Sequence, residues 1–261
     1  MSSDGSIVAI GAPAADGKNG DLNSGRVRVY TLNRTIWTQL GQDIVGEAAD
    51  DRSGISVAMS SDGSIVAIGA NDNNGNDGMA DKAGHVRVFT FNGTIWTQLG
   101  QDIDGEAAND KSGISVAMSS DGSIVAIGTN DNDAGAGDKA GHVRVYTLNG
   151  TIWTQLGQDI DGEGKRDKSG ISVAMSSDGS VVAIGANEND GAGDKAGHVR
   201  MYTLNGTIWT QLGQDIDGEG KKDKSGTSVV MSSDGSVVAI GANENDGAVN
   251  KAGHVRIYSS R

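Results

Sequence analysis

A unit of about 57 residues occurs five times in tandem, and this repetition constrains the fold more than any other feature of the sequence. The block Ser-Ser-Asp-Gly-Ser contributes Asp4, Asp62, Asp121, Asp178 and Asp234. A second block, (His/Arg)-Val-Arg-(Val/Met/Ile)-(Tyr/Phe), follows each copy of the first. Two further blocks, Thr-Ile-Trp-Thr-Gln-Leu-Gly and Ser-Gly-(Ile/Thr)-Ser-Val, occur four times each. We place the repeats at approximately 1–52, 53–111, 112–168, 169–224 and 225–261.

Each of the four blocks has the character of a β-strand. Ile65-Val66-Ala67-Ile68 is a short apolar run between turn residues, and Val86–Phe89 is rich in β-branched and aromatic residues. Asn-Gly and Asp-Gly pairs join the blocks, and a type I′ hairpin turn favours these pairs because both of its central residues have positive φ. No helical period persists, and 41 glycines would penalise helices heavily. The sequence predicts an all-β chain.

Tandem units of four antiparallel strands are typical of a β-propeller. We therefore predict a single propeller domain over 1–261, with five blades that are four-stranded antiparallel meanders. A parallel β-helix is the alternative, although its rungs are usually much shorter and its strands are not joined by two-residue hairpins.

The repeat also resembles a known family. Gly54-x-Ser56-Val57, Ile65–Ala70 and Gly84-x-Val86-x-Val88-Phe89 are similar to the FG-GAP blade of integrin α-subunit propellers, and the first repeat keeps Gly11-Ala12-Pro13. The resemblance implies that the Gly-x-Ser-Val strand is innermost in a blade and the Trp strand outermost. In place of that family's Asp-x-Asp-x-Asp-Gly calcium loop this chain has Ser-Ser-Asp-Gly-Ser, so calcium is not expected at that loop.

The strand count leaves two blades incomplete. The blocks supply 18 strands where five blades need 20, so the first blade lacks its innermost strand and the last its outermost. Unpaired strand edges are templates for association. We expect an imperfectly closed ring, closure by a neighbouring chain through these edges, or a chain cut from a longer array.

Charge and composition exclude several classes of function. The net charge of −13 disfavours nucleic acid and anionic lipid as partners. Apolar runs of four or five residues are too short to span a membrane, the N-terminus does not resemble a signal peptide, and there is no cysteine. All but five of the 34 acidic residues fall in the long loops and crossovers, which a meander places on one rim. The five exceptions are the Asp-Gly aspartates.

This acidic rim suggests calcium, which prefers hard oxygen ligands. The candidate ligands are the carboxylates and amides of three long loops: Asp72, Asn74, Asn76, Asp77, Asp131, Asp133, Glu188 and Asp190. Crossovers such as Asp102-Ile103-Asp104-Gly105-Glu106 offer a second group of oxygens. None of these segments fits the EF-hand template. The favoured interpretation is that the residues cap turns and keep the chain soluble, with calcium binding as the alternative.

Tryptophan and histidine each recur at one position in four of the five repeats. Trp37, Trp96, Trp153 and Trp209 are candidates for stacking on a sugar, although packing between blades is the favoured interpretation. His85, His142, His198 and His254 occupy equivalent positions, where we expect packing or hydrogen bonding between blades rather than metal binding or catalysis.

No known catalytic motif occurs, and the sequence is therefore interpreted as a non-enzymatic chain. The leading hypothesis is a binding or adhesion module that meets a protein or glycan through the acidic rim, assisted by calcium, in an extracellular or cell-surface protein. The alternatives are a purely structural repeat scaffold and, third, a carbohydrate-binding module.

Overall fold

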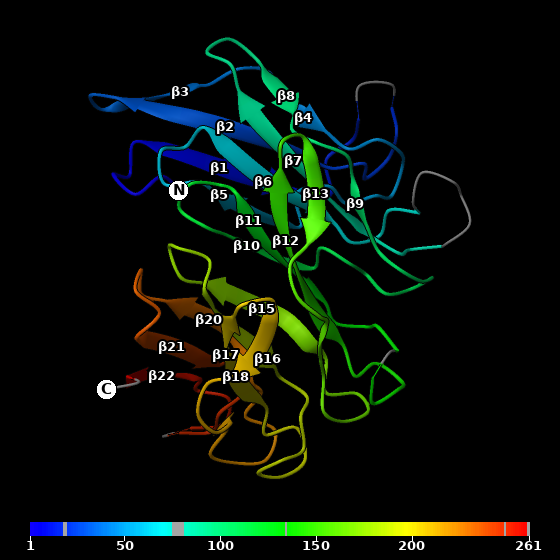
Figure 1. Ribbon diagram of the computed structural model, residues 1–261, viewed down its shortest axis with the longest axis vertical. Coiled ribbons are helices and arrows are strands. Elements are labelled where there is room, and N and C mark those ends of the chain that lie inside the picture. Colours follow the sequence, from blue (N-terminus) through cyan, green and yellow to red (C-terminus); the bar gives the residue numbers. More distant parts are fainter. Residues whose placement is uncertain (18–19, 75–80, 134, 248, 260–261) are drawn as a thin grey trace. The chain divides into compact units, whose positions relative to one another are not determined.

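A computed structural model describes residues 1–17, 20–74, 81–133, 135–247 and 249–259 (Figure 1). Within these residues the secondary structure consists of strands, turns and bends. The described part of the chain therefore contains no helix that could span a membrane. The all-β prediction is confirmed. The chain divides into two compact units, one of Met1–Val125 with Tyr146–Thr154 and one of Ala126–Val145 with Gln155–Arg261. Whether these units form a single domain is not tested, and the five repeats stay a sequence assignment.

Two antiparallel sheets lie wholly in the first unit. Their orders are β1-β2-β3 with β4 on β2, and β5-β6-β7-β8 with β9 on β7. The strands are β1 (Ile7–Ala12), β2 (Arg26–Asn33), β3 (Ile36–Gln39), β4 (Ile44–Val45), β5 (Ser56–Met59), β6 (Ile65–Ala70), β7 (His85–Phe91), β8 (Trp96–Gln98) and β9 (Ile103–Asp104).

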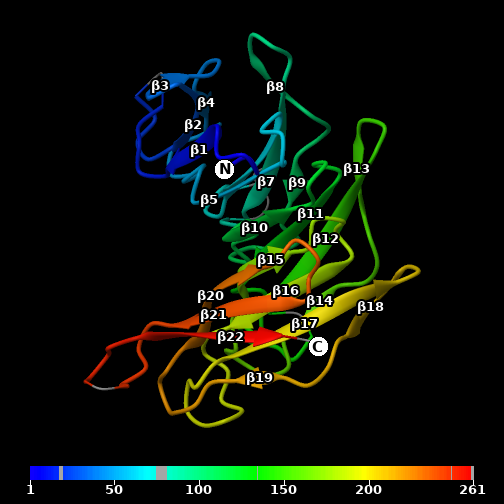
Figure 2. The ribbon, with the colours of Figure 1, turned by 90° about the vertical axis from the view of Figure 1, so that its left-hand side faces the viewer.

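Two further sheets lie wholly in the second unit. Their orders are β15-β16-β17-β18 with β19 on β17, and β20-β21-β22, whose three strands run side by side in Figure 2. The strands are β15 (Ser169–Met175), β16 (Val181–Ala186), β17 (His198–Asn205), β18 (Ile208–Gln211), β19 (Ile216–Asp217), β20 (Ser225–Met231), β21 (Val237–Ala242) and β22 (His254–Ser259).

The middle repeat is divided between the two units. It contributes β10 (Ser115–Met118), β11 (Ile124–Thr129), β12 (His142–Asn149), β13 (Ile152–Gln155) and β14 (Ile160–Asp161). Its strands repeat the chain order of the neighbouring repeats. The structure thus shows antiparallel sheets of three to five strands, and their arrangement as a five-bladed propeller stays a prediction.

The prediction of four strands per repeat was incomplete, because the crossover adds a fifth. Ile103 and Asp104 form β9, which pairs with the first residues of β7 in the register His85↔Asp104 and Val86↔Ile103. Ile103 is 3% exposed, so its burial holds the crossover against the sheet edge. Within the described residues both predicted deficits are present: the first sheet has no strand equivalent to β5, and β22 pairs only with β21.

The hairpins are confirmed, but their turns differ from the predicted type I′. In the Asp-Gly turn Gly63 has a φ of 75°, whereas the φ of Asp62 is not positive. The Gly63 amide donates a hydrogen bond to the Ser60 carbonyl at 3.0 Å. In the Asn-Gly hairpin Asn205 pairs with Ile208, so the loop is Gly206-Thr207, and only Gly206 has positive φ. A single left-handed residue therefore suffices in each turn.

The Asp-Gly turns are also held by the aspartate side chain. Asp62 Oδ1 accepts hydrogen bonds from Ser60 Oγ at 2.7 Å, the Ser64 amide at 2.9 Å and Ser64 Oγ at 2.8 Å. Hydrogen bonds of this kind favour the ionised carboxylate. Those from Ser60 and Ser64 lower the pKa of Asp62, and those from Ser232 and Ser236 lower the pKa of Asp234 to about 2.

These turns predict that acid destabilises the chain. A carboxyl whose pKa is lower in the folded than in the unfolded chain stabilises the fold above pH 4, and this contribution is lost as the pH falls toward 2. We expect the urea midpoint to fall over that range. A variant carrying Asp62→Asn and Asp178→Asn should start from a lower midpoint at pH 7 and fall less steeply. Parallel acid profiles of the two proteins would contradict this.

The core of each unit forms where one repeat packs on the next. In the first unit Val27 and Val29 of β2 are fully buried against Val66 and Ile68 of β6, and Trp96 completes the cluster. Apolar residues alternate along β2 with Arg26, Arg28 and Tyr30, which point to its other face, as the two-residue period of a strand requires. Every interior repeat therefore presents one apolar face to the repeat that follows it.

Candidate metal centre

The strand geometry brings together a histidine and carboxylates from two repeats. His85 is the first residue of β7 and 1% exposed, and Asp104 is its cross-strand partner. Glu47, from the crossover of the preceding repeat, lies against the same face. In this way residues 38 and 19 positions from His85 along the chain reach a single point, because β7 is flanked by its own crossover and by the previous one.

The distances within this cluster are those of potential ligands to one ion. His85 Nδ1 lies 3.9 Å from Glu47 Oε2 and 3.9 Å from Asp104 Oδ1. Ligand atoms of Glu47, His85 and Asp102 all lie within 4.8 Å of one another. Asp102 is oriented by Gln98, whose Nε2 donates to Asp102 Oδ1 at 2.6 Å. Hydrogen bonds of this type commonly orient metal ligands.

Arg87 and His85 face different oxygens of the Glu47 carboxylate. Arg87 follows His85 by two residues on the same face, and its Nη1 lies 3.2 Å from Glu47 Oε1. Its Nη2 donates to the Val45 carbonyl at 2.8 Å. Glu47 Oε1 thus faces the guanidinium while Oε2 faces the imidazole. The positive charge of Arg87 weakens the attraction of the cluster for a cation, and Asp102 and Asp104 oppose this effect.

The imidazole in this cluster is neutral at physiological pH. Burial and the neighbouring Arg87 lower the pKa of His85 to about 4, with Asp102 acting in the opposite direction. Burial has the opposite effect on the acid: it raises the pKa of Glu47. Neither ring nitrogen of His85 has a hydrogen-bond partner. A neutral imidazole keeps one nitrogen lone pair, and this lone pair can bind a metal ion.

The second unit contains the same arrangement. His198 is 1% exposed, its Nδ1 lies 3.7 Å from Asp215 Oδ2, and Glu163 completes the group. Arg200 Nη1 lies 3.3 Å from Glu163 Oε1. Burial and Arg200 lower the pKa of His198 to about 4, and its Nε2 has no hydrogen-bond partner. His142, fully buried with the same lowered pKa, occupies the equivalent position in the middle repeat.

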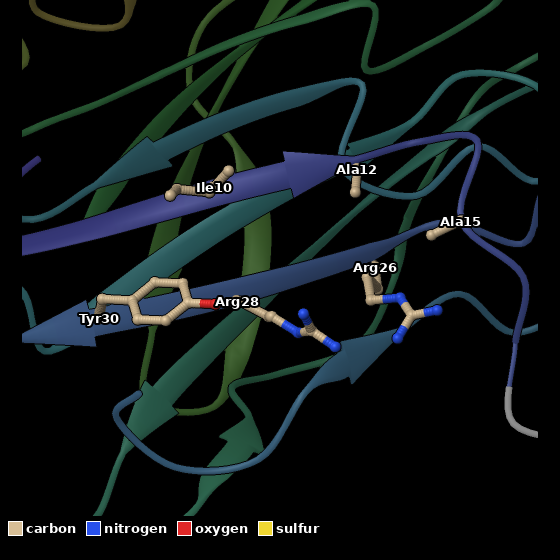
Figure 3. A pocket seen from close by; sticks show the side chains of 6 residues that line it. All are labelled: Ile10, Ala12, Ala15, Arg26, Arg28 and Tyr30. Atoms are coloured by element: carbon tan, nitrogen blue, oxygen red, sulfur yellow. The ribbon is translucent and has the colours of Figure 1, made fainter. Parts of the chain in front are cut away.

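The two end repeats depart from this pattern. Arg26 replaces the histidine in the first repeat, and Figure 3 shows Arg26 and Arg28 beside Tyr30 on the open face of β2, where they line a cavity of about 400 Å³. Both arginines pair with Asp43 of their own repeat, at 3.2 and 3.0 Å. In the last repeat His254 Nδ1 lies 3.6 Å from Glu219 Oε2, but His254 is 24% exposed and belongs to no three-ligand group among the described residues.

The loop residues predicted as calcium ligands interact with lysines, arginine or the loop backbone instead. Asp72 Oδ2 lies 3.3 Å from Arg52 Nε, and Asn74 Oδ1 accepts the Lys82 amide. Glu188 lies between two lysines, at 3.3 Å from Lys168 Nζ and 2.9 Å from Lys195 Nζ.

The other loop candidates make similar contacts where they are described. The Lys139 amide donates to Asp133 at 2.8 Å and the Lys195 amide to Asp190 at 2.8 Å, while Asp131 lies 4.0 Å from Lys139 Nζ. Asn76 and Asp77 fall outside the described residues. In the described part of the chain no three-ligand group includes any of these loop residues, so calcium binding there stays an untested prediction.

The tryptophans also separate into two kinds. Trp96, Trp153 and Trp209 are 3% exposed, and each indole Nε1 donates to a backbone carbonyl of the preceding repeat at 2.8 Å. Their ring faces are not open to a sugar. Trp37 alone, at 43% exposed, keeps a surface on which a ligand could stack. Trp37 lies beside Val8, Ile10 and Tyr30 of its own repeat.

Sequence reasoning missed the Glu–His–Asp groups, although it singled out their components. The periodic histidines and the acidic crossover clusters were treated separately, and the histidines were expected to pack or form hydrogen bonds. The signal that joins them is the short strand at Ile103, which sets Asp104 opposite His85. Without that pairing the histidine and its carboxylates are 17 to 38 residues apart.

Comparison with known proteins gives similarity at the level of fold alone. No protein-family model and no curated protein matches the sequence. Among solved structures, a candidate 6-phosphogluconolactonase from Bacteroides uniformis superimposes with a TM-score of 0.53 at 13% identity. The match covers 78% of this chain and 54% of the other, so the chain spans about half the length of that protein. The FG-GAP resemblance stays an expectation from the sequence.

This likeness corrects the expectation that the chain is not an enzyme. That expectation was based on missing catalytic motifs and on the uniformity of the repeats. A candidate enzyme nevertheless has a similar fold. Motif searches detect only the catalytic arrangements already known, and the same fold can carry catalytic and binding sites alike.

Proposed function

We propose that this chain is a divalent-metal-binding interaction module, built as a five-bladed propeller, that contacts its partner through its acidic loops. The observation that carries the proposal is the buried, neutral imidazole flanked by two carboxylates in each unit, as at His85 and His198. The FG-GAP resemblance of the repeats and the net charge of −13 support an interaction role with a basic protein surface or a glycan.

The donor set favours a transition metal over calcium. One imidazole nitrogen with two carboxylate oxygens suits Zn²⁺ or Co²⁺, whereas Ca²⁺ prefers six to eight oxygens. Two ligands of a tetrahedral Zn²⁺ site lie about 3.4 Å apart, close to the 3.9 Å between His85 Nδ1 and Glu47 Oε2. A water molecule or a group of the partner would complete the coordination. Calcium remains the alternative at the loops.

Metal titration tests this proposal. We expect isothermal titration of the full chain to show Zn²⁺ binding at neutral pH, and Co²⁺ to give visible absorption bands that Zn²⁺ abolishes. Affinity should decline as the pH falls toward 4, because the imidazoles then bind protons. Ca²⁺ should leave the cobalt spectrum unchanged.

Single substitutions locate the ions. His85→Ala and His198→Ala should each lower the number of bound Zn²⁺ ions by one. His254→Ala is the matched control: the residue occupies the same strand position but belongs to no three-ligand group in the described chain, so stoichiometry should not change. Equal stoichiometry in all three variants would show that the ions bind elsewhere.

A further inference from the structure

Three hairpins of the chain have the same sequence but not the same structure. The segment Asn-Gly-Thr-Ile-Trp-Thr-Gln-Leu-Gly begins at Asn92, Asn149 and Asn205. Asn149 and Asn205 are the last residues of β12 and β17, so each of their hairpin loops has two residues. In the second repeat β7 ends at Phe91, which pairs with Trp96. Asn92 therefore lies outside the ladder, as the first residue of a longer loop.

This longer loop directs two hydrogen bonds onto the Asn92 side chain. The Thr94 amide and the Ile95 amide both donate to Asn92 Oδ1, each at 3.0 Å. The two equivalent asparagines have no such donors in the described chain. Asn149 uses its side chain to donate, from Nδ2 to Thr154 Oγ1 at 2.6 Å, and Asn205 makes no side-chain hydrogen bond.

The atoms around Asn92 are arranged for an attack by the backbone on the side chain. The amide nitrogen of Gly93 can close a five-membered ring by bonding to Asn92 Cγ, and negative charge then develops on Oδ1. The two N–H groups that already point at Oδ1 stabilise such a charge, as oxyanion donors do in enzymes.

The attacking nitrogen is also free and unhindered. Among the described residues the Gly93 amide has no hydrogen-bond partner. A Cβ built on Gly93 would have nothing within 4 Å, and both Asn92 and Gly93 are exposed. Water can therefore reach the site.

We propose that Asn92-Gly93 is a site of spontaneous modification, at which the chain converts Asn92 to aspartate and isoaspartate without a second protein. The Gly93 nitrogen loses its proton to a solvent base and forms a bond to Asn92 Cγ. The Cγ–Nδ2 bond then breaks, and ammonia leaves with a proton taken from water. Water finally opens the resulting succinimide at either of its carbonyls, which gives aspartate or isoaspartate.

The reaction changes the hairpin that leads into β8. Either product adds a carboxylate, and isoaspartate also lengthens the backbone by one methylene group. Trp96 follows in β8, and its indole Nε1 donates to the Leu40 carbonyl of the preceding repeat at 2.8 Å. The modification is therefore placed beside a contact between repeats.

The other hairpins provide comparisons within the same chain. Asn149 and Asn205 have the same neighbours in sequence, but both are held in the strand ladder and neither has donors to Oδ1. In the first repeat Arg34 replaces the glycine after Asn33, and its side chain hinders the attacking nitrogen.

The rates at the individual asparagines test the proposal. Samples of the full chain kept in mildly alkaline buffer are cleaved after lysine and arginine, which places the three Asn-Gly pairs in different fragments for mass spectrometry. We expect Asn92 to react about tenfold faster than Asn149 or Asn205, a modest factor beside that of an oxyanion donor in an enzyme. Asn33 should be the slowest of the four.

The same measurement in guanidinium chloride shows whether the fold is the cause. Once the hairpins are unfolded, the three Asn-Gly pairs should react at equal rates because their sequences are identical. Equal rates in the folded chain, or a slower reaction at Asn92, would overturn the proposal. A preference for Asn92 that persisted in denaturant would overturn it as well.

Two substitutions of one residue test the hydrogen-bond donors. Thr94→Pro removes one N–H donor to Asn92 Oδ1, whereas the matched control Thr94→Ala keeps it. We expect a slower reaction at Asn92 in the proline variant and the parent rate in the alanine variant, with Asn205 as the internal reference. Equal rates at Asn92 in the two folded variants would refute the role of the donors. If the proline variant did not fold, the comparison of the folded and denatured parent would decide.

Discussion

The Trp96→Ala variant is expected to lose about 3–5 kcal/mol of its free energy of unfolding. Trp96 is 3% exposed and packs in one cluster with Val29, Val66 and Phe89. Truncation leaves a cavity between two repeats and removes the hydrogen bond from the indole Nε1 to the Leu40 carbonyl. Urea unfolding followed by far-ultraviolet circular dichroism measures the loss without relying on tryptophan fluorescence.

Trp37→Ala is the matched control for this experiment. The two residues occupy the same position in the repeat, but Trp37 is 43% exposed, whereas Trp96 packs against the preceding repeat and is 3% exposed. We expect a loss below about 1 kcal/mol, as for other surface substitutions. If both variants lost the same stability, the tryptophans would stabilise their own hairpins rather than the contact between repeats.

The strands and their order could be predicted because the determining interactions are local in sequence. Ile65–Ala70 and His85–Phe91 form strands where apolar and β-branched residues are bounded by glycine turns. The two-residue strand at Ile103 could not be predicted in this way. Its two residues carry too little periodicity, and the burial of Ile103 depends on a β7 edge that exists only after the sheet has formed.

The candidate metal centre depended on long-range contacts and was missed for that reason. His85 meets Glu47 only because the crossover of one repeat lies against the sheet of the next. The burial of each tryptophan could not be predicted for the same reason. Their sequences are identical around Trp37 and Trp209, yet one is exposed and the other buried, because burial is decided by the neighbouring repeat.

The contact between repeats also depends on glycines that admit no side chain. Gly69 lies in β6, and a Cβ there would lie 2.0 Å from the Gly113 carbonyl oxygen of the next repeat and 2.3 Å from Ser56 Oγ. A serine side chain can rotate away, whereas the carbonyl belongs to the backbone between two packed sheets. Relief therefore requires the repeats to separate, and overpacking of this kind typically costs about 1–3 kcal/mol.

Gly69→Ala is accordingly expected to lower the urea midpoint well beyond the effect of Gly241→Ala. Gly241 has the same place in β21, and its Cβ would meet only Ser228 of its own repeat, with Oγ at 2.3 Å. The difference between the two variants isolates the collision with the neighbouring repeat, since the serine contact and the change from glycine to alanine are common to both. Equal midpoints would mean that adjacent sheets separate at little cost, and the packing between repeats would then contribute little to stability.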